Sequence, residues 1–136
     1  MVQKIFVNLP VKDLTKSIAF FTKLGFTFNP QFTDDKATCM IISENIFAML
    51  LVEERFKDFT KKKISDAKKS TEVLIALSAD SRKNVDELVK KAVAAGGSIY
   101  MPSQDHGWMY GHSFADLDGH QWEVFYMDEE RALKKR

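Results

Sequence analysis

The side chains best suited to acid–base chemistry lie in the last third of this 136-residue sequence. The segment 105–114 is dense in aromatic and titratable groups and contains Tyr110 and His112. Histidine ordinarily titrates near neutral pH, so His112 is suited to proton transfer, with Tyr110 on the same strand face. Glu123 is the carboxylate that we predict as a general base. The competing interpretation makes Glu123 a structural residue, bonded to Asn8 or to a neighbouring strand.

Strand periodicity predicts which side chains accompany Glu123. Alternate residues of a strand point to opposite faces, so Gln121 and Phe125 share the face of Glu123. Trp122 and Val124 then point the other way, towards the helices. Apolar surface with a few polar groups is typical of a small-molecule pocket.

The first strand of each half contributes to the same predicted site. Phe6 and Asn8 share one face of a strand at 4–9, and Leu74 lies on the corresponding face of a strand at 72–78. The predicted catalytic residues are Glu123, His112 and Tyr110, and the predicted ligand-binding residues are Asn8, Phe6, Leu74, Gln121 and Phe125.

Other reactive groups leave alternatives open. His106, His112 and His120 fall on a loop, a strand and a turn; they are either structural or, with Glu123, part of a non-standard metal site. Cys39 is an inert small hydrophobe unless a neighbouring base activates it. No glycine-rich phosphate loop, serine nucleophile elbow or paired-cysteine zinc motif is present.

The elements that must position these groups follow one order twice. In the first half a strand at 4–9 ends at Pro10, Asp13 caps a helix, and Gly25 stops that helix. Its apolar residues recur at helical spacing: Leu14, Ile18, Phe21 and Leu24. Three strands follow, at 26–32, 37–43 and 46–52.

The second half repeats this order. A strand at 72–78 leads to a helix that is capped by Asp80 or Ser81 and closed by Gly96. The apolar stripe of that helix is Val85, Leu88, Val89 and Ala92. Strands are predicted at 98–102, 108–115 and 120–127. We therefore predict an α+β fold in which two βαβββ modules form a curved mixed sheet around a cleft.

The whole chain is predicted to be a single domain over 1–136. Its modules are 1–53 and 71–128, and a lysine-rich linker at 54–70 joins them. This linker is predicted to be a solvated connector with a helical turn or two. The alternative is a lid or a recognition site for an anionic ligand.

Composition narrows the possible partners. Hydrophobic residues make up 45% and charged residues 29%, as in ordinary folded proteins. Twenty basic and nineteen acidic residues give a net charge of +1, without the basic surplus that nucleic acid requires. No apolar run is long enough to span a bilayer, and a single cysteine suits a reducing compartment. We expect a cytoplasmic protein that binds neither nucleic acid nor membrane.

Four local stretches carry a recognisable pattern: 9–14, 17–21, 24–26 and 114–123. In this order they resemble the vicinal oxygen chelate superfamily, which includes glyoxalase I, bleomycin-resistance proteins and extradiol dioxygenases. Leu117 stands where that family usually has the proline of a D-P-D-G turn. Within the superfamily the chain is similar to bacterial predicted lactoylglutathione lyase-like proteins. The resemblance implies the paired-module fold, a small organic molecule as partner, and a homodimer.

Metal-dependent members of that superfamily hold one divalent ion with four side chains, from the first and last strand of each module. The matching positions here are Phe6, the segment 49–51, Leu74 and Glu123, and only Glu123 carries a donor atom. Catalytic zinc sites use about three protein ligands, and other divalent metals need comparable sets. We therefore predict no metal and no cofactor.

The leading interpretation is a metal-independent small-molecule-binding protein of the glyoxalase/bleomycin-resistance type. The alternative is a lyase or isomerase of the glyoxalase-like class that uses Glu123 as general base, with a divalent metal if ligands lie at a non-standard site. A third hypothesis is an interaction protein whose cleft has become a filled core.

Overall fold

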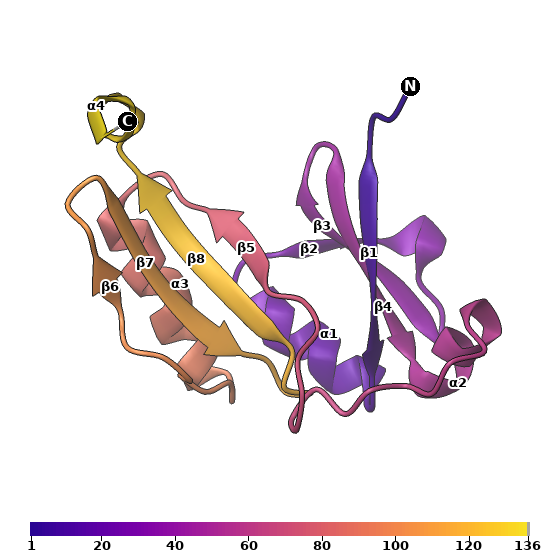
Figure 1. Ribbon diagram of the computed structural model, residues 1–136. Helices are drawn as coiled ribbons and strands as arrows, with labels where there is room; N and C mark the ends of the chain where they lie inside the picture. The colour runs from indigo at the N-terminus through magenta and orange to yellow at the C-terminus, as the bar shows by residue number, and fades with distance from the viewer. Residues whose placement is uncertain (136) are drawn as a thin grey trace. The chain divides into compact units, whose positions relative to one another are not determined.

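The computed structural model describes residues 1–135 and forms two compact units, the first spanning Met1–Ser65 and the second beginning at Asp66. Each unit has a four-stranded mixed sheet and a principal helix (Figure 1). The predicted α+β fold of two modules is therefore confirmed, with a separate sheet in each module. Over the described residues, no helix combines the length and the apolar character that crossing a membrane requires.

The first unit is built on a sheet in which only one neighbouring pair is parallel. Its strands are β1 (Ile5–Val11), β2 (Thr27–Asn29), β3 (Ala37–Ser43) and β4 (Ile46–Val52). Their order is β1-β4-β3-β2; β1 runs parallel to β4, and the other neighbours are antiparallel. Three short helical segments complete the unit: η1 (Pro30–Phe32), α2 (Glu53–Phe56) and η2 (Lys57–Phe59). The helical turns predicted for the connector are found as α2 and η2.

The helix α1 (Leu14–Lys23) begins and ends where the sequence predicts. The Asp13 carboxylate accepts a hydrogen bond from the backbone N–H of Lys16 at 3.1 Å, which satisfies one of the free donors of the first turn. Gly25 follows the helix with a φ of +104°, a conformation that glycine adopts without a steric penalty. Phe20 and Phe21 of α1 are buried, so this helix contributes its apolar face to the core of the first unit.

The second unit repeats the topology of the first. Its strands are β5 (Ile75–Ser78), β6 (Gln104–Asp105), β7 (Met109–Ala115) and β8 (Gln121–Met127), and its helices are α3 (Arg82–Ala94) and α4 (Glu129–Lys135). The strand order is β5-β8-β7-β6, with β5 parallel to β8 and the other neighbours antiparallel. The helix α3 packs against β7 and β8 and therefore covers one face of the sheet.

The core of the second unit lies between α3 and the two central strands. Trp122 and Val124 of β8 are completely buried, and Phe114 of β7 stacks on Trp122 with ring centroids 6.2 Å apart. Val85 and Val89 supply the apolar surface of α3. The predicted alternation along β8 is confirmed, because the residues between these buried ones are more exposed.

Several predicted boundaries are wrong in the first unit. The first strand does not end at Pro10, because β1 continues to Val11; as an edge strand of its sheet, β1 tolerates a residue that has no N–H. The predicted strand at 26–32 stops after Asn29. There the Asn29 side chain accepts from the backbone N–H of Gln31 and starts η1.

In the second unit the structure differs from the prediction at two places and decides between the two predicted helix caps. The strand predicted at 98–102 is reduced to a single bridge between Ser98 and Ala115, and the short strand β6 follows it. Ser81 rather than Asp80 caps α3, accepting from the backbone N–H of Asn84 at 3.0 Å. The helix α4 has no counterpart among the predicted elements.

A buried carboxylate organises the turn that leads into β8. Asp116 Oδ1 accepts hydrogen bonds from the backbone N–H groups of Asp118 and His120, and Asp116 Oδ2 accepts one from Trp122 Nε1, all at 3.0 Å. Gly119 closes the turn with a φ of +92°. A Cβ at this position would lie 2.9 Å from the backbone nitrogen of Lys68, so the turn requires glycine for both reasons.

We expect Asp116→Ala to lower the free energy of unfolding by about 3 kcal/mol, since it removes three hydrogen bonds around a buried indole. Asp116→Asn keeps an acceptor for the two backbone N–H groups and removes a carboxyl whose pKa is raised by burial, so its loss should be about 1 kcal/mol. Urea unfolding followed by tryptophan fluorescence measures both. Equal losses for the two variants would contradict this account of the turn.

Candidate functional site

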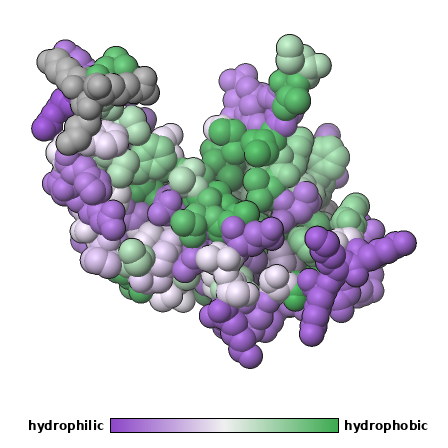
Figure 2. Space-filling view, viewed as in Figure 1, coloured by the Kyte–Doolittle hydropathy of each residue, from purple (hydrophilic) through white to green (hydrophobic). Residues whose placement is uncertain are grey.

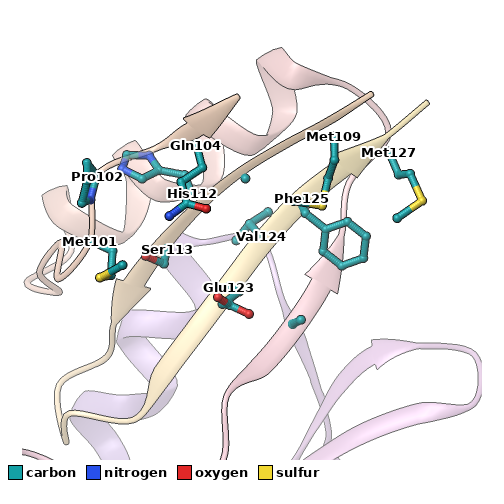
Figure 3. A pocket seen from close by; sticks show the side chains of 12 residues that line it. Met101, Pro102, Gln104, Met109, His112, Ser113, Glu123, Val124, Phe125 and Met127 are labelled. Carbon is teal, nitrogen blue, oxygen red and sulfur yellow. The ribbon is translucent and has the colours of Figure 1, made fainter. Parts of the chain in front are cut away.

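A cavity of about 300 Å³ lies in the second unit, over the strands β7 and β8 (Figure 3). This volume is at the lower end of the usual range for small-molecule pockets, roughly 300–1,000 Å³. Its lining is mainly apolar with a few polar groups. The lining residues are Ala76, Met101, Pro102, Gln104, Met109, Gly111, His112, Ser113, Glu123, Val124, Phe125 and Met127.

Strand register explains why these residues meet. In the sheet, Glu123 stands between Ala76 of β5 and Ser113 of β7. In the next row on the same face, Phe125 is opposite Gly111. Trp122 and Val124 direct their side chains to the opposite, helix-covered face, so the cavity is on the face that α3 leaves open.

Glu123 is the carboxylate of this cavity. Its side chain is exposed and projects from β8 (Figure 3). Among the described residues of the second unit, Glu123 makes no hydrogen bond to a neighbouring strand, and no cation is paired with it. The carboxylate is therefore available to a ligand.

Gly111 creates room in the cavity floor. A Cβ built at this position would meet only the carbonyl oxygen of Val124 at 3.8 Å and Phe125 Cβ at 3.9 Å, which are ordinary contacts. The backbone therefore does not demand glycine here. What the missing side chain provides is open space beside Phe125.

Thioethers and one aromatic ring are the bulkiest apolar groups of the lining. Met109 and Met127 are register partners at one end of the β7–β8 pair, and Phe125 lies next to them in the sheet. Met101 lies on the β6 side of the cavity (Figure 3). Methionine side chains are flexible and polarisable, so they can adapt to apolar ligands of different shapes.

Tyr100 is a polar neighbour of the site that sequence analysis missed. Its hydroxyl oxygen is buried and has no hydrogen bond of ordinary geometry among the described residues. Burial raises the pKa of Tyr100; the adjacent Ser113 side chain opposes this rise, and the Glu123 carboxylate adds to it. The bridge between Ser98 and Ala115 brings Tyr100 alongside Ser113, and only that long-range pairing reveals its place.

Tyr110 and His112 do not join Glu123. The Tyr110 hydroxyl donates to Asp86 Oδ1 of α3 at 2.6 Å, and this bond, together with burial, raises the pKa of Tyr110. The Arg82 guanidinium lies 5.3 Å from the centre of the Tyr110 ring. His112 borders the cavity at the β6 side, but its imidazole points away from Glu123 (Figure 3).

A set of hydrogen bonds from α3 fixes the loop beside Tyr110. Arg82 donates to Asp105 Oδ2 at 2.7 Å and to the carbonyl oxygen of Gly107 at 2.8 Å. The same carbonyl accepts from Arg131 at 3.0 Å. Tyr110 therefore belongs to a structural network on the helix side of the sheet.

Of the remaining predicted ligand-binding residues, Leu74 and Gln121 do not line this cavity. Phe6 and Asn8 belong to the first unit, where Phe6 stacks on Phe47 at 4.7 Å and Asn8 bonds the carbonyl oxygen of Phe6 at 3.4 Å. Leu74 is exposed and precedes β5, and Gln121 is half-buried at the start of β8. Figure 2 shows hydrophobic surface gathered over the β1 region. The Phe6 ring of β1 is half-exposed.

The residues present do not fit the divalent metal centre that the resemblance implies. Phe6 and Leu74 carry no lone pair, and Met49 to Leu51 offer no hard donor. Among residues 1–135, no cluster of three or more His, Cys, Asp or Glu side chains is arranged to hold an ion. Cys39 is buried, and burial raises the pKa of its thiol, so the position suits an inert packing residue.

Comparison with known proteins connects this geometry to a family. The model of the Glyoxalase/Bleomycin resistance protein/Dioxygenase superfamily matches residues 5–124. A hypothetical protein from S. aureus is 30% identical, with a TM-score of 0.79 over 93% of this chain and 94% of the other. No curated protein matches.

Two further solved structures share the fold at lower identity. A glyoxalase-related enzyme from Fulvimarina pelagi is 20% identical, with a TM-score of 0.78 over 93% of this chain and 88% of the other. The fosfomycin resistance protein FosX from Listeria monocytogenes is 22% identical, with a TM-score of 0.68 over 96% and 99% of the two chains.

We expect Tyr100→Phe to leave the free energy of unfolding unchanged or to raise it by about 1 kcal/mol, because the buried hydroxyl that it removes makes no hydrogen bond of ordinary geometry among the described residues. The matched variant Tyr110→Phe removes a hydroxyl bonded to Asp86 and should lower that free energy by about 1 kcal/mol. Denaturant unfolding of both variants gives the comparison. A larger loss for Tyr100→Phe than for Tyr110→Phe would show that the Tyr100 hydroxyl is bonded in solution.

Proposed function

The chain belongs to the glyoxalase/bleomycin resistance protein/dioxygenase superfamily, and we propose that it is a metal-independent protein that binds a small organic molecule in the β7–β8 cavity. The observation that carries this proposal is the cavity itself. It joins Glu123, a carboxylate without a partner among the described residues, to an apolar lining, and Gly111 keeps its floor open. Such a combination orients a ligand by a few polar contacts and binds it by apolar burial.

Independence from metal is supported by the chemistry of the side chains. Of the positions at which the superfamily holds its ion, only Glu123 has a suitable donor. One carboxylate leaves most of a divalent ion's coordination to water, which is too weak for a resident catalytic metal. Phe6 and Leu74 are instead suited to apolar contact. Together with Asn8 and Gln121 they remain proposed ligand-binding residues in their own right, not as part of the β7–β8 lining.

The assembly and location of the protein are part of the same proposal. We propose a cytoplasmic homodimer whose modules are 1–53 and 71–128, with neither nucleic acid nor membrane as partner. The near-zero net charge supports the exclusion of nucleic acid as a partner. Half-exposed apolar side chains such as Ile5 and Ile46 would be buried if a second chain packed against them. Light scattering coupled to gel filtration measures the oligomeric state directly.

An enzymatic role for the same residue is a second candidate. The unpaired Glu123 carboxylate favours it, because a general base must be free to accept a proton from a carbon acid. Tyr110 and His112 are less suited to assist, since Tyr110 is bonded to Asp86 and the His112 ring points away from Glu123. The reaction class would be a lyase or isomerase step.

Filling the cavity tests the binding proposal. We expect Gly111→Leu to weaken ligand binding at least about tenfold, since the new side chain occupies the space beside Phe125. The melting temperature without ligand should be kept or raised, because leucine suits a strand better than glycine. A thermal-shift screen of aromatic antibiotics and small metabolites supplies the ligands, and Gly111→Ala should have an intermediate effect.

The control for that screen is Ser43→Leu, which adds the same side chain at an exposed strand end in the first unit. It should leave every ligand-induced shift unchanged. Stabilising ligands that are unaffected by Gly111→Leu would place binding elsewhere. A screen in which nothing stabilises the wild type would favour an interaction protein.

An assay with methylglyoxal and glutathione, with and without added nickel or zinc, tests the second candidate. We expect no turnover above the uncatalysed rate, because no set of metal ligands accompanies Glu123 in the part of the chain that the structure describes. Turnover that falls about a hundredfold in Glu123→Gln would instead establish Glu123 as the base of an enzyme.

A further inference from the structure

We propose that the ligand of the β7–β8 cavity is an apolar molecule that carries a cationic amine. This inference rests on the proposed binding function and adds the chemical class of the ligand. Three observations support it: the charge of the lining, the nature of its apolar groups, and the hydroxyl groups of Ser113 and Tyr100 near Glu123.

The charge of the lining is one-sided. Among the side chains that the structure describes, Glu123 is the only acidic one that borders the cavity, and no lysine or arginine borders it. A ligand seated over Glu123 takes water away from the carboxylate, and a desolvated charge without a partner is costly. A cationic group on the ligand removes that cost, whereas an anionic ligand would add repulsion.

The apolar groups of the lining are also favourable to a cation. The Phe125 ring can attract a positive charge through its face. Met109 and Met127 place polarisable thioethers next to that ring. Hydrocarbon attached to the amine can be buried against these side chains, so one ligand satisfies both parts of the cavity.

The register pair Glu123 and Ser113 offers a place for the ammonium group. An ammonium ion has three N–H donors and needs several acceptors close together. Glu123 provides carboxylate oxygens, and its register partner Ser113 provides a hydroxyl. The Tyr100 hydroxyl lies next to Ser113 and makes no hydrogen bond of ordinary geometry among the described residues. The Ser113 O–H can therefore turn towards Tyr100 when the Ser113 oxygen accepts from the ligand.

Cavity size limits the ligand. A volume of about 300 Å³ suits one ring with a short chain rather than a large polycyclic molecule. Three probes with the same skeleton therefore isolate the charge: 4-phenylbutylamine, 4-phenylbutanol and 4-phenylbutyrate. At neutral pH they carry a positive charge, no charge and a negative charge.

Isothermal titration of the full chain with each probe tests the inference. We expect 4-phenylbutylamine to bind about tenfold more tightly than the alcohol, and the carboxylate to bind most weakly. Glu123→Gln should reduce amine affinity about tenfold and leave alcohol affinity nearly unchanged. The matched control Glu44→Gln removes the same charge from an exposed turn of the first unit and should change neither.

The outcomes separate this inference from the proposed function. Equal affinities for amine and alcohol, or an amine affinity that Glu123→Gln leaves intact, overturn the amine assignment. If Gly111→Leu still abolishes the binding of neutral or acidic molecules, the binding function stands while this inference fails. If neither the probes nor the screening library bind, both fail.

Discussion

Burial of Trp122 and Val124 against α3 is the constraint on which the second unit depends. Strand side chains alternate with a period of two, so a slip of one residue in β8 would expose both and bury Glu123 instead. The loss of apolar burial, together with the cost of a buried charge, makes that slip prohibitive. The core therefore decides that Glu123 and Phe125 share the open face of the sheet.

The turn before β8 reinforces the same register. Asp116 bonds the indole of Trp122 as well as two backbone N–H groups of its own turn. It thereby links the pairing of β7 and β8 to the orientation of the largest core side chain. Gly119 lets this turn lie directly against the backbone at Lys68. The position of Ser113 opposite Glu123 follows from this turn, although neither residue takes part in it.

Sequence alone could predict what depends on local pattern. The Asp13 cap and the alternation of Trp122 with Glu123 are local features, and both are found. The face on which Tyr110 and His112 lie is not local, because parity within β7 says nothing of the register with β8. The position of Tyr100 depends on a bridge between distant segments. Proline usually ends a strand, and only the position of β1 at the edge of its sheet explains why the strand continues past Pro10.

The thioethers that line the cavity give it a chemical vulnerability. Met101 and Met127 are partly exposed, so oxidants in solution can reach their sulfur atoms. Oxidation would convert each thioether into a polar sulfoxide and would replace adaptable apolar surface by strong acceptors. Exposure to peroxide would therefore weaken the binding of apolar ligands in the cavity. Methionine sulfoxide reductases would restore the thioethers and with them the apolar lining.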